Sequence, residues 1–187
     1  MKFDSVTPID NAGRNKIFIG KLGSKKYLIK RYVKHHLFEK SYKENRSCEL
    51  LCYKRLSWKN IPGFVEGSVS KRYLITKYVP GGQLQWSRET IDLVLAVFEE
   101  DFLQTDGRFL PKRRYDHLIP KLIKRSRELE EHGVISGAEL FEQLLQANKA
   151  ELMVSAKYFS HGDPRDGNLL MSRGKVYVID FENSRRD

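Results

Sequence analysis

The chain has 187 residues, of which 40% are apolar and 31% charged, and its formal net charge is +10 at pH 7. This composition is too apolar for a disordered polyelectrolyte, and no apolar run is long enough to span a bilayer. The two cysteines exclude a disulfide scaffold, and the N-terminus shows no secretory signal, so we expect a cytoplasmic protein. The positive charge suits an anionic partner without selecting one.

Residues 1–82 predict an N-terminal lobe built from a sheet and one helix. Apolar residues recur at helical spacing through residues 37–56. Pro80-Gly81-Gly82 then interrupts the chain, and we expect a hinge near this point. The β-rich runs of this lobe cover residues 17–22, 26–32, 65–69 and 73–79.

Residues 83–187 predict a helical lobe that ends in a β-hairpin of strands 168–171 and 175–179. One helix follows the cap Ser87, a second runs from near Asp116 to about His132, and a third begins at Ser136 with the spacing of a capping box. The apolar stripes of the first and third helices are expected to be buried. They consist of Ile91, Val94, Leu95, Phe98 and Phe102, and of Leu140, Phe141, Leu144 and Leu145.

Two carboxylates and one carboxamide lie close together around the C-terminal hairpin. Asp163 lies in a turn rich in Gly and Pro, Asn168 enters the first strand, and Asp180 follows the second. Asn168 and Asp180 occupy hairpin positions that can share a hard cation, and Mg²⁺ prefers a few protein oxygens together with phosphates and water. Asp163 is left to accept a proton from a hydroxyl, which is the division of labour that phosphoryl transfer needs.

The order His-Gly-Asp-x-x-x-x-Asn followed by Ile-Asp-Phe-Glu resembles the aminoglycoside phosphotransferase family, which includes choline-kinase-like enzymes. The resemblance implies an α+β, protein-kinase-like bilobed fold, with an N-terminal antiparallel sheet and helix and a helical C-terminal lobe. It also implies that Asp163 is the catalytic carboxylate and that Asn168 and Asp180 hold magnesium. His161 resembles the histidine that braces this loop from within the fold.

The N-terminal lobe carries further points of resemblance. Lys30, in Tyr-Leu-Ile-Lys, resembles the strand lysine that pairs with the α- and β-phosphates of ATP. Glu49 resembles the helix glutamate that holds this lysine, with Glu44 as the competitor one turn earlier. Lys77 and Val79 lie where the family has the hinge whose backbone binds adenine.

Residues 11–15 occupy the place of the loop that covers the phosphates, although the Gly-x-Gly-x-x-Gly pattern is missing. The resemblance implies phosphate contacts from Gly13, Arg14 or Asn15. Arg165 falls where protein kinases carry a catalytic-loop lysine, and two roles stay open for it. It either contacts the transferred phosphoryl group or braces the loop by pairing with Asp163 or Asp166.

The resemblance implies an ATP- and Mg²⁺-dependent phosphotransferase acting on a hydroxyl of a small molecule or sugar. Basic residues between hinge and catalytic loop favour an anionic acceptor such as a phosphorylated glycan. The alternatives are a compact atypical protein kinase and a catalytically impaired nucleotide-binding remnant. We expect a monomer that binds no nucleic acid, because no such motif is present, while contact with a membrane surface stays open. The chain ends shortly after Glu182, where family members continue with further helices, so we expect a C-terminal lobe that is naturally short or truncated.

Overall fold

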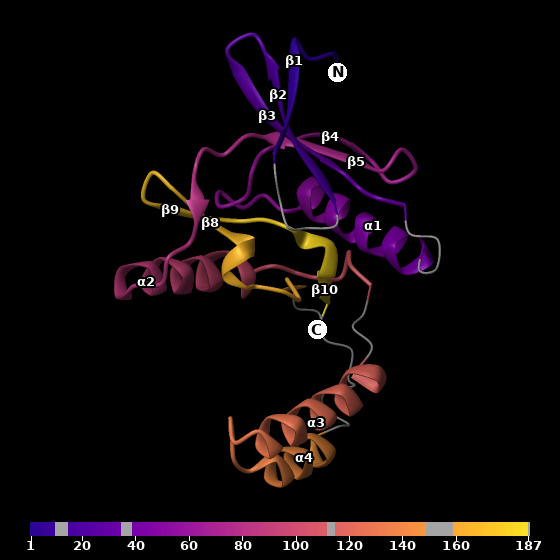
Figure 1. Cartoon of the computed structure of the whole chain (residues 1–187), viewed down its shortest axis with the longest axis vertical. Helices are drawn as coiled ribbons and strands as arrows, with labels where there is room; N and C mark the ends of the chain where they lie inside the picture. Colours follow the sequence, from indigo (N-terminus) through magenta and orange to yellow (C-terminus); the bar gives the residue numbers. More distant parts are fainter. Residues whose placement is uncertain (10–14, 35–38, 112–114, 149–158, 187) are drawn as a thin grey trace.

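The computed structural model describes residues 1–9, 15–34, 39–111, 115–148 and 159–186. Its upper part is a five-stranded antiparallel sheet with the strand order β1-β2-β3-β5-β4 (Figure 1). The strands are β1 (Ser5–Ile9), β2 (Lys16–Leu22), β3 (Lys25–Arg31), β4 (Phe64–Ser68) and β5 (Tyr73–Lys77). The predicted strands are therefore present, with β1 in addition.

The helix α1 (Glu39–Arg55) lies between this sheet and the C-terminal end of the chain (Figure 1). Cys48 and Cys52 lie one turn apart on its buried face, and both are free thiols. The helix contacts β4 on one side and the short 3₁₀ turn η3 (Phe181–Asn183) on the other. It thereby connects the N-terminal sheet with the last segment of the sequence.

The predicted C-terminal hairpin is formed by β8 (Leu169–Ser172) and β9 (Lys175–Val178). The short strand β6 (Gly82–Gln83) joins it next to β8, so the segment after the predicted hinge becomes part of this sheet. Gly81 allows this close approach, because a Cβ there would lie 2.3 Å from the carbonyl oxygen of Met171. A two-stranded pair, β7 (Phe159–Ser160) with β10 (Arg185–Arg186), and the 3₁₀ turn η2 (Asp166–Asn168) complete the region.

An aromatic core lies beneath the hairpin. Trp58 packs on Phe102 with ring centroids 4.6 Å apart and on Phe159 at 5.0 Å, and Phe181 is fully buried beside them. Such ring pairs contribute about 0.5–1.5 kcal/mol each beyond the area that they bury. This core fixes the segment before the loop that carries Asp163, through Phe159, and the segment after β9, through Phe181.

The helix α2 (Arg88–Val97) begins at the predicted cap, where the Ser87 side chain accepts a hydrogen bond from the Thr90 N–H. It packs on β9 and continues into a π-helical turn, η1 (Phe98–Phe102). The predicted stripe is buried only in part, because Val94 is buried whereas Ile91 is 45% and Leu95 53% exposed. The face of α2 that packs on β9 is centred on Val94 and Val97, so Ile91 and Leu95, at the edge of the predicted stripe, stay in solvent.

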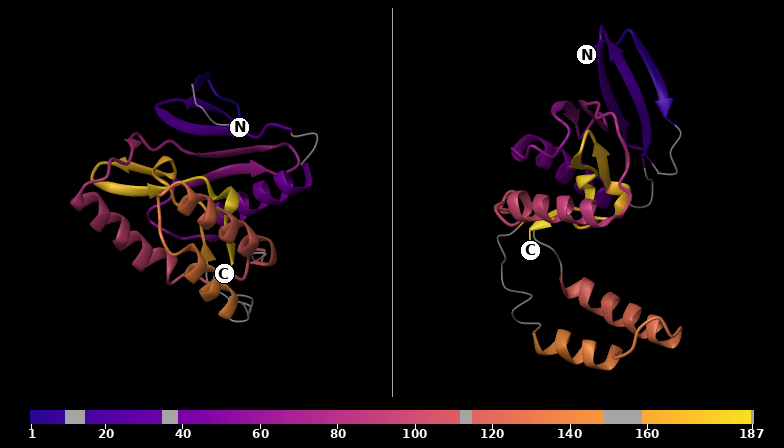
Figure 2. Two further views of the ribbon diagram at one scale, coloured as in Figure 1. Left: turned by 60° about the horizontal axis from the view of Figure 1, so that its bottom comes forward. Right: turned by 90° about the vertical axis from the view of Figure 1, so that its left-hand side faces the viewer.

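The helices α3 (Tyr115–Glu131) and α4 (Ala138–Ala147) pack on each other and project away from the sheets (Figures 1 and 2). The expectation of a buried α4 stripe is wrong, since Leu140 is 61% and Leu144 54% exposed. A two-helix hairpin has one internal interface, so apolar side chains on its outer faces stay in solvent. Within the ranges described, no helix combines the length and apolarity needed to cross a membrane.

The predicted capping box at Ser136 is also absent. The residue that precedes α4 is Gly137, in a left-handed conformation, and glycine has no side chain that could cap the helix. Instead, Glu130 of α3 accepts hydrogen bonds from the N–H groups of Gly137 and Ala138, at 2.7 and 3.2 Å. The Glu130 carboxylate of α3 thus accepts hydrogen bonds from the backbone N–H groups at the start of α4, which the capping box at Ser136 was expected to satisfy.

Candidate active site

A cavity of about 610 Å³ lies between the five-stranded sheet and the C-terminal hairpin. Nine of the predicted site residues line it, and they come from both halves of the chain. They are Asn15, Lys30, Glu49, Lys77, Val79, Asp163, Arg165, Asn168 and Asp180. The other two, Gly13 and Arg14, lie outside the described residues.

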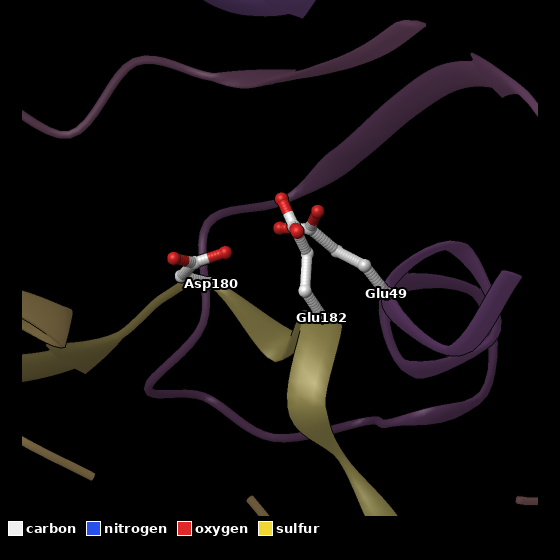
Figure 3. Close-up of side chains that lie close together, drawn as sticks. All are labelled: Glu49, Asp180 and Glu182. Carbon is white, nitrogen blue, oxygen red and sulfur yellow. The ribbon is translucent and has the colours of Figure 1, made fainter. Parts of the chain in front are cut away.

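Lys30 of β3 lies at the centre of this cavity wall and is 7% exposed. Its Nζ lies 2.9 Å from Oε2 of Glu49, 2.7 Å from Oδ1 of Asp180 and 2.6 Å from Oε1 of Glu182. Figure 3 shows these three carboxylates pointing toward one another, Glu49 from α1 and the other two from the segment after β9. The predicted pairing with Glu49 is present, whereas Glu44, the competitor, lies 3.5 Å from Arg185.

The charges of this cluster do not balance, because three carboxylates surround one ammonium. Burial alone would lower the pKa of Lys30, but the neighbouring Glu49, Asp180 and Glu182 outweigh it and raise that pKa well above its ordinary value. Burial raises the pKa of Glu49 to about 7, against the opposing effect of Lys30. The cluster therefore carries an excess of negative charge that suits an additional cation.

Two further side chains complete the cluster, and sequence reasoning had given neither contact. The Tyr32 hydroxyl donates to Oε2 of Glu49 at 2.7 Å, and Asn15 Nδ2 donates to Oε1 of Glu182 at 2.6 Å. Asn15 thus contacts the last segment of the chain across the cavity. Glu182 is the last residue of the Asp-Phe-Glu motif, and Tyr32 lies two positions after Lys30, so both residues lie in segments that the sequence singles out. Their hydrogen-bond partners are distant in the sequence and could not be predicted from neighbouring residues.

The loop that carries Asp163 is held from beneath by His161, which is 2% exposed. His161 Nε2 lies 2.9 Å from the carbonyl oxygen of Ile179, and its Nδ1 lies 3.4 Å from the backbone N–H of Asp163. A neutral ring that donates from Nε2 and accepts at Nδ1 satisfies both contacts. Burial lowers the pKa of His161, which favours this neutral form.

Gly162 is needed between these two residues. Its φ is +81°, and a Cβ at this position would lie 2.3 Å from the carbonyl oxygen of Asn183. Only glycine combines that left-handed backbone with so close an approach. The geometry therefore explains the His-Gly-Asp sequence. His161 is buried and holds the loop, Gly162 makes the turn because it has no side chain, and Asp163 places its carboxylate in the lining of the cavity.

Asp163, Asn168 and Arg165 form a second polar group at the mouth of the cavity. Asn168 Nδ2 donates to the backbone oxygen of Asp163 at 2.9 Å and to its Oδ2 at 3.2 Å. Arg165 Nε lies 3.3 Å from the same Oδ2. This contact with Asp163 is the one expected of a brace, while contact with the transferred phosphoryl group stays a prediction.

The predicted metal ligands Asn168 and Asp180 lie at adjacent levels of the hairpin, because the Ile179 N–H donates to the Asn168 carbonyl oxygen at 3.0 Å. Asp180 has a left-handed φ of +63°, which turns the chain from β9 into η3. Carboxylate oxygens of Glu49, Asp180 and Glu182 lie within 4.8 Å of one another, and Asn168 lines the same cavity. Such oxygen donors fit a hard divalent cation.

The hinge segment is partly engaged in the sheet. The Lys77 N–H donates to the Gly63 carbonyl oxygen at 2.8 Å, and the Tyr78 N–H donates to that of Lys26 at 3.1 Å. A backbone contact from Lys77 to a ligand therefore cannot use its N–H without breaking the sheet. Both Lys77 and Val79 nevertheless line the cavity, and their contact with a nucleotide stays a prediction.

A family model described as the phosphotransferase enzyme family matches residues 5–187. A search of curated protein sequences found no match. Among solved structures, the streptomycin-ATP-APH(2")-IIa ternary complex is 16% identical, with a TM-score of 0.62 over 100% of this chain and 69% of that one. The choline kinase LicA from Streptococcus pneumoniae is 20% identical, with a TM-score of 0.56 over 99% of this chain and 65% of that one.

A third solved structure, spectinomycin phosphotransferase APH(9)-Ia in complex with ADP and spectinomycin, is 16% identical. It matches with a TM-score of 0.57 over 100% of this chain and 66% of that one. At such identities the likeness shows the fold, which is the α+β, protein-kinase-like fold expected from the motifs. Because the family model covers nearly the whole sequence, the chain belongs to the phosphotransferase enzyme family.

Proposed function

We propose that the chain transfers the γ-phosphoryl group of ATP to a hydroxyl group of a small molecule or sugar, with Mg²⁺ as the cofactor. The observation that carries this proposal is the convergence of Lys30, Asp163, Asn168 and Asp180 on one cavity. A fixed cation, a set of oxygen donors for a metal and an accessible carboxylate are the parts that phosphoryl transfer requires. The division into residues 1–82 and 83–187 is part of the proposal, with the cavity between the two lobes.

The inner end of the cavity suits the nucleotide. Leu28 of β3 and Leu170 of β8 provide apolar surface from the two sheets, between which a flat base fits. Thr76 lines the cavity as well, and among the residues described its buried hydroxyl has no hydrogen-bond partner. Val79 follows at the hinge, where its backbone is available to the base edge.

Lys30 is assigned to the α- and β-phosphates. Its three ammonium protons are directed to three carboxylates, so a phosphate must displace at least one of them. Asp180, whose side chain is 37% exposed, has the most accessible of these carboxylates, whereas Glu49 is almost completely buried. Glu49 is therefore the partner expected to stay.

Asn168 and Asp180 are the residues assigned to Mg²⁺, with Glu182 beside them. When bound, the ion offsets the negative charge of the phosphates and of the surrounding carboxylates. Asp163 is assigned to the acceptor hydroxyl, which it orients and from which it accepts the proton. Its side chain is 31% exposed, so an acceptor can reach it from solvent.

Two of the solved structures named above contain ATP or ADP together with an antibiotic, streptomycin or spectinomycin. These ligands support a small-molecule acceptor and an adenine nucleotide for this chain too. The basic residues between the hinge and the catalytic loop favour an acceptor that is anionic.

The test is to measure thermal unfolding with ATP and Mg²⁺, each alone and together, followed by incubation with labelled ATP and panels of sugars and amino alcohols. We expect joint stabilisation by ATP and Mg²⁺, and label transfer to a small hydroxyl compound. In Asp180→Asn the Mg²⁺ dependence of the ATP effect should disappear, whereas Asp106→Asn, outside the cavity, should keep it. Label in protein bands of a lysate alone would favour a protein kinase, and binding without any transfer would favour a remnant.

A further inference from the structure

Tyr32 is buried beside the nucleotide cavity, with 4% of its surface exposed. It lies two residues beyond Lys30, just after β3 ends, and its backbone N–H donates to the carbonyl oxygen of Arg72 at 2.9 Å. This bond places the side chain on the same side as that of Lys30. The Lys30 ammonium lies 5.4 Å from the centroid of the Tyr32 ring.

The Tyr32 hydroxyl and the Lys30 ammonium share one acceptor. Oε2 of Glu49 accepts from Tyr32 at 2.7 Å and from Lys30 at 2.9 Å, while Oε1 lies 3.1 Å from the same ammonium. Lys30 alone would leave the carboxylate able to rotate about its bond to the helix side chain. The second donor fixes the plane of the carboxylate, and with it the direction from which Lys30 is held.

This restraint differs from the other two contacts of Lys30. Asp180 and Glu182 both lie after β9 and line the open side of the cavity, so they are the contacts that a bound metal and phosphates compete for. Glu49 is 1% exposed and keeps its place on α1. Once the other carboxylates are drawn away, Glu49 alone directs Lys30, and Tyr32 alone adds a second restraint on Glu49 among the contacts described.

We propose that Tyr32 is a positioning residue for nucleotide binding, which holds the Glu49 carboxylate so that Lys30 meets the phosphates in a fixed orientation. The inference rests on the proposed function, because it assigns Lys30 to the phosphates. Tyr32 itself contacts neither nucleotide nor acceptor in this assignment. Its effect is transmitted through Glu49.

The test compares the affinity of the full chain and of Tyr32→Phe for a nonhydrolysable ATP analogue with Mg²⁺, by calorimetry. The substitution keeps the ring and removes one hydrogen bond to a charged group, so we expect Kd to rise about three- to tenfold. Tyr73→Phe is the matched control, because its hydroxyl also donates to a glutamate, Glu66, on the same sheet but away from the cavity. Its Kd should equal that of the unmodified chain.

A double-mutant cycle separates positioning from general packing. In a Glu49→Gln background, Tyr32→Phe should change Kd by less than about twofold, because the residue through which it acts is altered. Thermal unfolding of every variant shows whether it is folded. If Tyr32→Phe changes Kd equally with Glu49 and with Glu49→Gln, then Tyr32 acts through packing and not through Glu49, and the proposal is overturned.

The remaining outcomes separate this inference from the proposed function. If Lys30→Met weakens binding of the analogue but Tyr32→Phe binds as tightly as the unmodified chain, only the role of Tyr32 is overturned. If the unmodified chain does not bind the analogue, or if Lys30→Met binds it equally well, the proposed function is overturned and the inference falls with it.

Discussion

The Lys30 ammonium lies 2.7 Å from Oδ1 of Asp180, although 150 residues separate the two in the sequence. One residue belongs to the third strand of the N-terminal sheet and the other follows the last hairpin strand. Their contact joins the N-terminal sheet to the segment after the hairpin, and it brings the cation assigned to phosphates next to a carboxylate assigned to the metal.

Replacing Lys30 with methionine should destabilise the fold as well as weaken nucleotide binding. Removal of the ammonium leaves Glu49 buried without its counterion, and such a loss typically costs about 3–5 kcal/mol. We expect this loss in urea unfolding at pH 8. It should shrink at pH 6, because the pKa of Glu49, already about 7, lies higher without Lys30, and the protonated acid no longer needs a cation.

The double variant Lys30→Met/Glu49→Gln is the control for this interpretation. It removes both charges, so it should be more stable than Lys30→Met at pH 8 and should show less of the pH effect. A double variant that is as unstable as the single one would locate the cost in packing rather than in the buried charge.

Replacing Asp163 with asparagine should abolish most transfer and leave nucleotide binding intact. Its carboxylate is the group that we assign to the acceptor hydroxyl, and loss of a general base typically lowers the rate about 10²- to 10⁴-fold. The measurement is single-turnover label transfer together with Kd for Mg-ATP, with Asp106→Asn as a surface control. An unchanged transfer rate in Asp163→Asn would remove this residue from the mechanism.

His161 should make stability depend on pH in the acidic range. Burial lowers its pKa in the folded protein, so the unfolded chain binds the proton more readily. The stabilising contribution is therefore fully present above about pH 6.5, the ordinary histidine value, and is lost as the pH falls. We would measure the melting temperature between pH 5 and 8. It should fall less steeply towards acidic pH in His161→Gln than in the unmodified chain, whereas the exposed control His132→Gln should show the same pH dependence as the unmodified chain.

Two glycines in left-handed conformations separate backbone strain from steric conflict. Gly174→Ala, at φ +73° with open space around the missing Cβ, should cost about 1–2 kcal/mol of unfolding free energy. Gly162→Ala adds a clash with the Asn183 carbonyl oxygen and should cost clearly more, while also lowering the transfer rate by moving Asp163. If the two variants lose the same free energy of unfolding, the loop around Gly162 must move to make room for the added methyl group.

Much of the candidate site could be predicted because each part has a local pattern. His161, Gly162 and Asp163 follow one another in a turn, Asn168 and Asp180 flank one hairpin, and motif order places them around a metal and a hydroxyl. The strands of the two hairpins and the helix cap at Ser87 also follow from neighbouring residues. The cap at Ser136 failed because Glu130, on another helix, supplied the hydrogen bonds.

Periodicity and motif order thus determined by themselves four strands of the N-terminal sheet, the C-terminal hairpin, the helices, the family and nine of the residues that line the cavity. Only the tertiary structure decided that Asn15 donates a hydrogen bond to Glu182 and that Tyr32 donates one to Glu49. It also decided that one apolar face of α4 stays in solvent. Side-chain spacing along a chain specifies which face of an element is apolar. It does not specify which distant group meets that face, because that depends on how all the elements pack at once.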